Sequence, residues 1–487
     1  MKKILLLVLS VITFQSQAQT YMYGTTFEGG DNNLGTIYRV DENGQNFQKV
    51  FDFSTSTGGN PRGGLTLGPD GKMYGFTTAE GQAVNPGGTP SGSFYKFDPV
   101  TNSLQVIKYF NTEEPFGYEF NDAPLLASNG NLYAASTYLG SNVVQANVFI
   151  RYEISTGSLS ILDTLDYAAF GYLDSKLMQA SDNNIYFATV RSIPNHAAII
   201  KYDLTLNTFT LIHNSLGSVV LPPGSTLSEY DVPINNPLFE ASNGMLYGAS
   251  RGGGNYDEGN VFKINKDGSG YQTLHVFTSG LSVEGFIPAG GFVEHNGKLY
   301  SATQQQGGLN LNSGTFYTIN LSTDAVEHPH ILDVEGIDPL GTFVLSPNGR
   351  LYITCSGRST NNGSLVEWNL NNNTLTQRHA YNGTGGAKPY RNGLCIVDFS
   401  SLSVDESNLA DLNISIFPNP VSDYLSIKSS GKNTIEKIDL YNTNGQLVYS
   451  SYSQEPINIS RFESGVYFIQ LKINGSKIIT KKIIKNN

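Results

Sequence analysis

The chain has 487 residues and a formal net charge of −11, and only 15% of its residues are charged. This low charge, together with 28 Tyr and 26 Phe, excludes a long disordered chain, because disorder requires high net charge and few aromatic residues. Residues 19–413 carry nineteen Lys or Arg against thirty-six Asp or Glu. This acidic body repels phosphate backbones, so no nucleic-acid partner is expected.

Residues 1–18 have the pattern of a signal peptide. Lys2 and Lys3 precede an apolar run over 4–14, which is too short to span a bilayer. Small residues before the expected cut predict cleavage between Ala18 and Gln19. No other segment is long and apolar enough for a membrane span, so we expect no transmembrane segment in the mature chain.

The middle of the chain repeats one motif, in which a tight turn leads into an aromatic strand. Six copies end on a tyrosine: PDGKMY at 69–74, SNGNLY at 128–133, SDNNIY at 181–186, SNGMLY at 242–247, HNGKLY at 295–300 and PNGRLY at 347–352. A seventh copy, at 21–24, starts without its turn. The anchor tyrosines are Tyr23, Tyr74, Tyr133, Tyr186, Tyr247, Tyr300 and Tyr352, which are 51 to 61 residues apart. Self-similarity at this period indicates a repeat architecture.

Each copy contains four expected strands, which is the pattern of a β-propeller blade. The first copy lacks its inner strand, because the mature chain starts almost at Tyr21, whereas 394–397 reads as an inner strand that nothing follows. We therefore expect residues 19–399 to form a seven-bladed β-propeller. The end of this segment would complete the first blade and leave no open sheet edge between the chain ends.

The recurrence of Tyr-Gly-x-Ser/Thr, with a Gly-Gly pair a few residues on, resembles the GloVer-type tandem repeats of exported bacterial proteins. Copies one, five and six fit best, with YGTT at 23–26, YGAS at 247–250 and YSAT at 300–303. Copies three, four and seven depart from the pattern after the tyrosine. This resemblance implies no known chemistry.

Two further segments follow the repeats. Residues 400–413 are rich in Ser, Asp, Asn and Leu without periodicity, so we expect a linker. Over 414–487, apolar and polar residues alternate with a period of two between turns. This alternation predicts a small immunoglobulin-like β-sandwich of about seven strands, so the expected fold class is all-β throughout.

Four ordered motifs in residues 414–487 resemble the type A sorting domain of the type IX secretion system, the Por secretion-tail family of Bacteroidota. The residues that carry the resemblance are Pro418, Asn419, Pro420, Gly445, Gly465, Tyr467, Lys481 and Lys482. It implies export across the inner membrane by the N-terminal signal and across the outer membrane by the type IX machinery, which is thus an expected partner. The mature protein is then secreted or attached to the outer cell surface.

Loop lengths predict a binding face on the propeller. Long loops join the second strand to the third and one blade to the next, and both sets share one face. Aromatic rings and polar groups on such loops suit sugars, which stack on aromatic faces and need partners for their hydroxyls. The candidates for this face are Phe116, Tyr118, Phe120, Tyr172, Asp174, Tyr230, Phe286, Tyr390 and Arg391. The alternative is that these aromatic residues only pin long loops to the blades.

Three functions remain open from the residues alone. We expect an exported, non-catalytic propeller that binds a glycan, a peptide or a surface partner. The rival is a polysaccharide hydrolase or lyase that uses loop carboxylates such as Glu119 and Asp174 on the same face. A glycosidase needs two carboxylates about 5 to 9 Å apart, which sequence does not pair. The third is a purely structural surface protein.

No catalytic residue, cofactor or metal site is expected. His328 and His330 flank a proline, but no third ligand is evident nearby, and zinc sites need three or four. Cys355 and Cys395 are the only cysteines, and we expect two buried thiols, with a disulfide as the alternative. Trp368 takes the register of core residues in the other copies and is expected to lie between blades.

Overall fold

The protein is described from a computed structural model. It describes residues 20–80, 90–112, 115–136, 146–166, 172–173, 175–191, 196–214, 237–252, 258–278, 284–305, 313–332, 338–357, 361–391, 393–398, 414–429, 434–442, 447–453, 455–462, 464–473 and 477–486. Within these ranges the secondary structure consists of strands, with no helix, so the expected all-β class is confirmed. The chain divides into two compact units, Tyr21–Val397 and a second that contains Asp398–Asn487.

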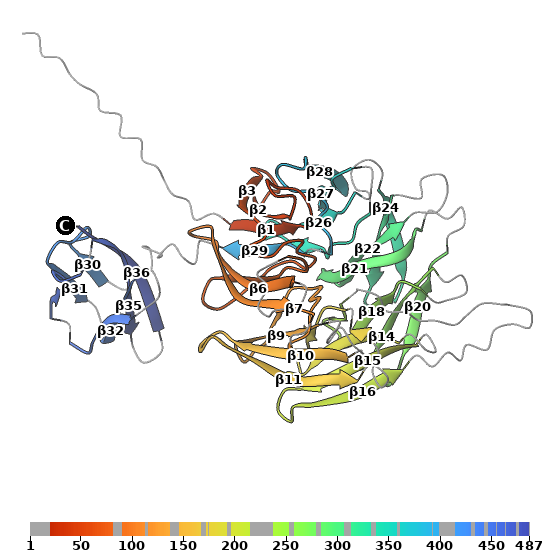
Figure 1. The fold of residues 1–487 in the computed structure, drawn as a ribbon, viewed down its shortest axis with the longest axis horizontal. Coiled ribbons are helices and arrows are strands. Elements are labelled where there is room, and N and C mark those ends of the chain that lie inside the picture. The colour runs from red at the N-terminus through yellow and green to blue at the C-terminus, as the bar shows by residue number, and fades with distance from the viewer. Residues whose placement is uncertain are drawn as a thin grey trace, which may run out of the picture. The chain divides into compact units, whose positions relative to one another are not determined.

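Seven antiparallel sheets lie between Thr20 and Asp398, and Figure 1 shows them following one another around a ring in chain order. Sheet 1 contains β29 (Cys395–Asp398), β1 (Thr20–Thr26), β2 (Thr36–Asp41) and β3 (Gln48–Asp52), and sheet 2 contains β4 (Thr66–Leu67), β5 (Met73–Phe76), β6 (Pro90–Asp98) and β7 (Ser103–Asn111). Sheet 3 contains β8 (Leu125–Leu126), β9 (Asn131–Ala135), β10 (Ala146–Glu153) and β11 (Ser158–Asp166). Sheet 4 contains β12 (Tyr172–Leu173), β13 (Met178–Gln179), β14 (Ile185–Arg191), β15 (His196–Asp203) and β16 (Thr208–Asn214).

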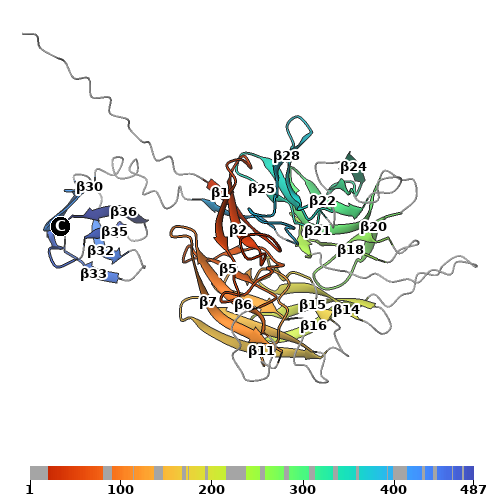
Figure 2. The same ribbon diagram turned by 45° about the horizontal axis from the view of Figure 1, so that its top comes forward.

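Sheets 5 to 7 repeat the four-stranded order from the axis outward. Sheet 5 contains β17 (Phe239–Glu240), β18 (Leu246–Ser250), β19 (Asn260–Ile264) and β20 (Gln272–Val276). Sheet 6 contains β21 (Phe286–His295), β22 (Lys298–Gln305), β23 (Thr315–Asn320) and β24 (Val326–Ile331). Sheet 7 contains β25 (Val344–Leu345), β26 (Arg350–Cys355), β27 (Ser364–Asn369) and β28 (Thr374–Ala380). The late strand β29 lies beside β1, so sheet 1 is built from both ends of this unit (Figures 1 and 2). A closed ring of seven blades stays a prediction.

The repeated turn motif has a local cause. In the second copy, one carboxylate oxygen of Asp70 accepts a hydrogen bond from the backbone N–H of Lys72 (3.2 Å), and the other accepts one from the Tyr74 hydroxyl (2.8 Å). Asp182 repeats both contacts, with Asn184 and Tyr186 as partners. Such side-chain contacts to the backbone two residues on are typical of tight turns. One acidic or amide residue thus closes the turn and orients the anchor tyrosine.

In several copies the anchor tyrosine is followed by a glycine, and the large residue opposite this glycine on the next strand explains why; we call this size compensation. Gly75 pairs with Tyr95 across β5 and β6, and a Cβ atom on Gly75 would lie 2.5 Å from the Tyr95 hydroxyl oxygen. The pairs Gly24–Tyr38 and Gly248–Phe262 repeat this arrangement. Where a large residue replaces the glycine, the partner is aliphatic and not aromatic, as in Phe187–Ile200 and Ile353–Val366, whereas the small Ser301 keeps the tyrosine partner Tyr317. A large residue on one strand is therefore matched by a smaller one on the other.

The outermost strand pair carries a register shift in all seven sheets. In sheet 2 it falls between Phe94 and Tyr95 of β6, and the other six sheets shift at the corresponding place in their third strands. A β-bulge bends a strand and increases its twist. The shared shift gives every sheet the same distortion, which lets neighbouring sheets pack alike.

Hydrophobic clusters join each sheet to the next. One cluster combines Tyr74 and Phe94 of sheet 2 with Val148 of sheet 3, and another joins Phe316 of sheet 6 to Trp368 of sheet 7. Trp368 is 2% exposed, which confirms it as a core residue. A further cluster joins the last sheet to the first, through Tyr352, Leu365, Met22, Tyr38 and Leu394. Sheets 7 and 1 are therefore packed as neighbours.

The second unit has two sheets around one core. The sheets contain β30 (Ile414–Phe417), β31 (Tyr424–Ser429) and β34 (Ile457–Asn458); and β33 (Leu447–Ser451), β32 (Ile435–Asn442), β35 (Gly465–Ile473) and β36 (Lys477–Lys485). A single hydrophobic cluster contains residues from both sheets, among them Ile416, Leu425, Leu440 and Ile469. Two sheets that share such a core form a small β-sandwich.

Two of the sorting motifs are held by contacts inside this second unit. The side-chain oxygen of Asn419 accepts a hydrogen bond from the backbone N–H of Ile484 (2.8 Å). The backbone of Val421 also bonds to Ile484, so the Pro-Asn-Pro segment lies against the final strand. Tyr467 is buried, and its ring stacks on Phe462. Gly445 and the side chain of Lys482 lie outside the part of the chain that the structure describes.

Candidate binding site on the propeller axis

A cavity of about 100 Å³ lies where the seven sheets meet. Most of its lining residues come just before an innermost strand. The cavity is lined by Gly64, Leu65, Asp122, Ala123, Lys176, Pro237, Gly290, Leu340, Thr342, Val344, Arg391, Gly393 and Leu394. Because every sheet contributes, the cavity lies on the axis of the ring. The chain enters each innermost strand from the loop that connects it to the previous sheet. The cavity, which is lined by residues just before these strands, therefore lies on the face that holds the loops between blades.

Glycines allow the backbones to meet around this cavity. A Cβ atom on Gly64 would lie 2.6 Å from the carbonyl oxygen of Gly393, and one on Gly290 would lie 2.2 Å from that of Gly341. These distances are shorter than a carbon and an oxygen atom tolerate. We call the backbone segments around the cavity, which include Gly64, Gly290, Gly341 and Gly393, the collar of the ring. In the collar the backbones approach one another directly, which leaves little room for side chains.

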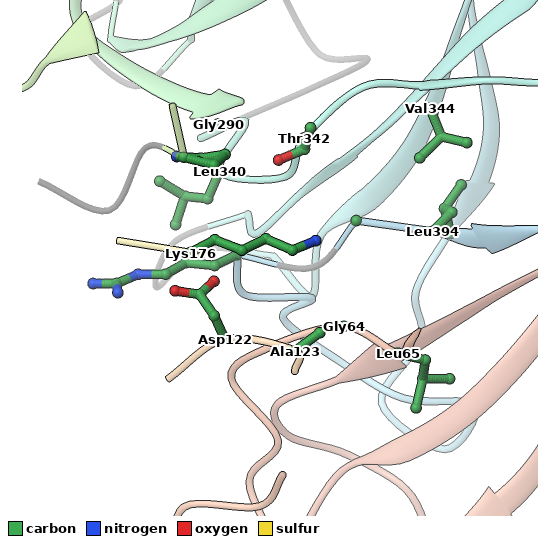
Figure 3. A pocket seen from close by; sticks show the side chains of 13 residues that line it. Gly64, Leu65, Asp122, Ala123, Lys176, Gly290, Leu340, Thr342, Val344 and Leu394 are labelled. Atoms are coloured by element: carbon green, nitrogen blue, oxygen red, sulfur yellow. The ribbon is translucent and has the colours of Figure 1, made fainter. Parts of the chain in front are cut away.

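Charged side chains enter the cavity where the collar leaves space. Lys176 stands two residues before β13 and is half-buried; Figure 3 shows its side chain crossing the cavity, with the ammonium on the side of Val344 and Leu394. Within the described residues this ammonium has no hydrogen bond or ion pair. The carboxylate of Asp122 lies on the same side of the cavity as the stem of Lys176 (Figure 3).

The thiol of Cys395 is close enough to this charge to feel its field. Burial raises the pKa of Cys395 to about 12, although the positive charge of Lys176 acts in the opposite direction. Cys355 is also buried, and both cysteines are free thiols, as expected. Neither is a nucleophile at neutral pH, because a buried thiol with a raised pKa stays protonated.

A cluster of aromatic and cationic side chains borders the cavity. The rings of Phe27 and Tyr390 lie 5.8 Å apart, and the Arg62 guanidinium carbon is 5.9 and 6.0 Å from their centroids. Arg391, which lines the cavity, lies 5.5 Å from the ring of Tyr390. Arg62 also donates a hydrogen bond to the side-chain oxygen of Asn121 (3.2 Å). The axial face thus combines aromatic surface with guanidinium groups.

The predicted face residues separate into three groups. Phe120 and Phe286 are 1% and 6% exposed, and Phe120 stacks on Phe76, so both belong to the core and not to an open face. Phe116 and Tyr118 are half-buried against the same cluster as Phe120. Of the predicted set, Arg391 lines the cavity, and the ring of Tyr390 lies 5.5 Å from its guanidinium. Asp174 and Tyr230 lie outside the described residues, as does the side chain of Tyr172.

Sequence reasoning missed Lys176, Arg62 and the role of Asp122. The signal that finds them is position, because the residues just before each short inner strand face the axis. Lys176 stands two residues before β13, a place that Gly64, Ala123, Pro237, Thr342 and Gly393 hold in other copies, and Asp122 stands one residue earlier in its own copy. Lys176 is thus the charged residue at a place where these other copies carry small or uncharged residues.

Comparison with known families supports this architecture. A model of the Gloeobacter/Verrucomicrobia repeat matches residues 12–200 and 195–400, which is well over half of the chain. The chain belongs to the Gloeobacter/Verrucomicrobia repeat family. A model of the secretion system C-terminal sorting domain matches residues 415–486. Both expected resemblances are confirmed, and the sorting domain makes this repeat protein a secreted or outer-surface protein.

Curated relatives of this repeat protein match it only in part. An ulvan lyase of Nonlabens ulvanivorans is 32% identical over 94 residues, which are 18% of this chain and 17% of the lyase. An endo-acting ulvan lyase of Formosa agariphila is 33% identical over 88 residues, or 17% of each chain. The chain thus spans about a sixth of the length of the curated relatives it matches.

Solved structures resemble the repeat protein in fold. A putative 6-phosphogluconolactonase from Bacteroides fragilis has a TM-score of 0.52 at 15% identity, covering 79% of this chain and 99% of its own. A second one, from Bacteroides uniformis, has the same TM-score and identity, covering 78% and 100%. At such identity the likeness shows the fold alone. No helix in the described residues is long and apolar enough to cross a membrane.

Proposed function

We propose that this exported propeller binds the acidic group of a saccharide at its axial cavity, without converting it chemically. The observation that carries the proposal is the ammonium of Lys176, a half-buried charge in the cavity with no partner among the described residues. A carboxylate or sulfate there would gain a charge-assisted hydrogen bond, which is about twice as strong as a neutral one.

The electrostatics of the whole body support an anion at this place. Residues 19–413 are strongly acidic, so an anionic ligand is repelled from most of the surface. Around the cavity, Lys176, Arg391 and Arg62 outnumber Asp122. A cationic patch in an acidic body selects where an acidic ligand can dock, because like charges elsewhere disfavour other poses.

The size of the cavity limits what enters it. Pockets that enclose a whole small ligand have volumes of about 300–1,000 Å³. A cavity of about 100 Å³ takes one charged group and leaves the rest of the ligand outside. Tyr390, whose ring lies 5.5 Å from the guanidinium of the lining residue Arg391, offers apolar surface against which the rest of a sugar packs. The proposal is therefore a saccharide whose acidic end enters the axis.

A binding screen combined with an activity assay tests the proposal. Uronic-acid-containing, sulfated and neutral polysaccharides are titrated against the purified propeller, while reducing ends and unsaturated products are measured in parallel. The proposal expects saturable binding of the acidic polysaccharides, weaker at high salt, and no product. Equal binding of neutral polysaccharides would contradict it.

A polysaccharide lyase or hydrolase is the second candidate, and the short matches to ulvan lyases are the observation in its favour. Asp122 would then be the carboxylate nearest to the bound acidic group. Product that disappears in Asp122→Asn but persists in Glu119→Gln would establish this alternative. Activity in neither variant would mean that the site had been misassigned.

Export requires processing at both ends of the chain. We propose that residues 1–18 are removed as a signal peptide and that 414–487, the sorting domain, is cut off after passage through the outer membrane, with 400–413 as the linker. The matched sorting domain supports the second cut. Intact-mass measurement of the protein from culture medium and cell surface tests this. A periplasmic form with its C-terminus intact would refute it.

A further inference from the structure

We infer that His275, Glu284 and His328 form a binding site for a transition-metal ion of the zinc type between sheets 5 and 6. His275 lies in β20, the outermost strand of sheet 5, and His328 in β24, the outermost strand of sheet 6. Glu284 lies two residues before β21, where sheet 6 begins. One ligand atom from each residue lies within 4.8 Å of the others.

The distances fit an ion with a small adjustment of the side chains. Ligand atoms around a tetrahedral zinc ion are about 3.3 Å apart, because each lies about 2.0–2.1 Å from the metal. Nε2 of His275 is already 3.4 Å from a carboxylate oxygen of Glu284. The two imidazole centroids are 5.2 Å apart. The ligand atoms lie within 4.8 Å of one another, which is about 1.5 Å more than a bound ion requires, so a small movement of the side chains brings them around one ion.

Three ring nitrogens at this place are buried without a well-formed hydrogen bond, although Nε2 of His275 lies 3.4 Å from the Glu284 carboxylate. Nε2 of His275 and both ring nitrogens of His328 are shielded from solvent, and none makes a well-formed hydrogen bond to the described residues. A buried polar atom without a partner costs about 1–3 kcal/mol. One metal ion would satisfy a nitrogen of each ring, which removes this cost at two positions.

Aromatic packing holds the two rings in place. The ring of Phe277 lies 4.8 Å from that of His275 and 6.1 Å from that of His328, and Tyr317 lies 6.3 Å from His328. Phe277 and Tyr317 are fully buried. This apolar floor leaves the open side of both rings toward Glu284, which is 39% exposed and therefore accessible to an incoming ion.

The three donor groups indicate which kind of ion the site would take. Two imidazoles and one carboxylate are a common zinc set, whereas hard cations such as Ca²⁺ prefer oxygen ligands alone.

The site corrects the interpretation of the His-Pro-His segment. His330 is not the partner of His328, because its Nε2 contacts the side-chain oxygen of Asn373 (2.9 Å) and its ring meets Trp368 edge-on. The partners come instead from another sheet, 53 residues away at His275, and from the preceding loop. A metal ion here would clip sheets 5 and 6 together at the rim, away from the axial cavity.

Metal titration of the full-length protein tests the inference. After treatment with chelator, Zn²⁺ and Co²⁺ are titrated by calorimetry, with Ca²⁺ as the comparison ion, and the Co²⁺ absorption spectrum reports coordination. We expect one equivalent of Zn²⁺, a spectrum typical of four-coordinate Co²⁺, and no binding of Ca²⁺. The thermal midpoint should rise with Zn²⁺, because a ligand that binds only the folded state stabilises it.

Two variants separate this site from other histidines. His328→Ala should raise the Kd for Zn²⁺ by about 100-fold or more, since losing a ligand costs more than losing a group that only orients one. His330→Ala is the matched control and should leave the Kd unchanged. Glu284→Gln keeps the packing and should also weaken binding, which covers the case that His328→Ala does not fold. Absence of binding in the parent protein, or equal binding in all variants, would overturn the inference.

Discussion

The carbonyl oxygen of Gly393 would lie 2.6 Å from a Cβ atom on Gly64, although the two residues are 329 positions apart in the chain. Gly393 comes two residues before β29, the strand that completes sheet 1, and Gly64 comes two residues before β4 of sheet 2. The end of the repeat region is therefore packed against its beginning at the axis, with no space between the two backbones.

Gly64→Ala should destabilise the propeller, because the new methyl group meets a backbone oxygen that cannot rotate away. Overpacking of this kind costs about 1–3 kcal/mol. Gly393→Ala is the matched control, since its Cβ would find its nearest neighbour, in Thr342, at 3.9 Å. Chemical denaturation of both variants measures the difference. Equal free energies of unfolding would show that the collar is looser than described.

Size compensation between Gly75 and Tyr95 predicts a strong coupling. Gly75→Ile alone should be severely destabilising, because its side chain would overlap the tyrosine ring. The double variant with Tyr95→Val copies the pairing of Ile353 with Val366 in the last copy, so it should recover part of the loss. We expect a coupling free energy of about 1–3 kcal/mol in a double-mutant cycle. Simple additivity would refute size compensation.

Glu367 is the most completely buried acidic group with a described ion pair. It is 1% exposed, accepts two hydrogen bonds from Arg378 at 2.7 and 2.9 Å, and accepts one from the anchor Tyr352 at 2.8 Å. Burial alone would raise the pKa of Glu367, but the hydrogen bonds and the charges of Arg378 and Arg350 outweigh it and hold that pKa below its usual range.

The pH dependence of Glu367→Gln follows from this lowered pKa. The stabilisation is present above the pKa of an unfolded glutamate, about 4.3, and is lost as the pH falls through the lower folded value. At pH 7 the variant should lose about 1.5–3 kcal/mol, the range for hydrogen bonds to a charged group. The difference from the parent should shrink in acid.

Unfolding titrations between pH 7 and pH 3 check this. Glu327→Gln is the control, because the ion pair of Glu327 with Lys298 is exposed to solvent and contributes little. A loss at Glu367 that is constant across the pH range would show that the carboxylate charge has no role.

Truncation tests the closed, seven-bladed ring. A chain that ends at Asn382 lacks β29 and with it the buried Leu394 and Val397, each worth about 1.5–3 kcal/mol. A chain that ends at Ser400 keeps this strand. We expect a clearly lower thermal midpoint for the first chain only. Equal midpoints would contradict closure of sheet 1 by the end of the repeats.

The repeats were predictable because their cause is local. Asp70 and Tyr74 are four residues apart, and the same spacing recurs in the other turns, so the period of the chain shows in the sequence. The late strand at 394–397 was predicted by counting, since one copy lacked an inner strand. Local spacing and a count of copies were enough to predict the class of the fold.

The candidate sites depend on contacts between distant copies and were not predictable in this way. Lys176 belongs to a position where other copies carry uncharged residues such as Gly64, Pro237 and Thr342, and only the meeting of all sheets shows that it faces a cavity. His275 and His328 belong to different sheets, so the spacing of either residue alone indicates nothing. Phe120 and Phe286 failed as face residues because burial depends on how each loop folds back.

The proposed function depends on Lys176, which would bind the acidic group of a saccharide. The most direct measurement is calorimetric titration of a uronic-acid oligosaccharide into the parent protein and into Lys176→Met, with Lys298→Met, at the opposite end of the blades, as the matched control. A charge-assisted hydrogen bond of about 1.5–3 kcal/mol predicts a 10- to 100-fold rise in Kd for Lys176→Met and no change for Lys298→Met. An unchanged Kd for Lys176→Met, in a variant that unfolds at the parent temperature, would contradict the account.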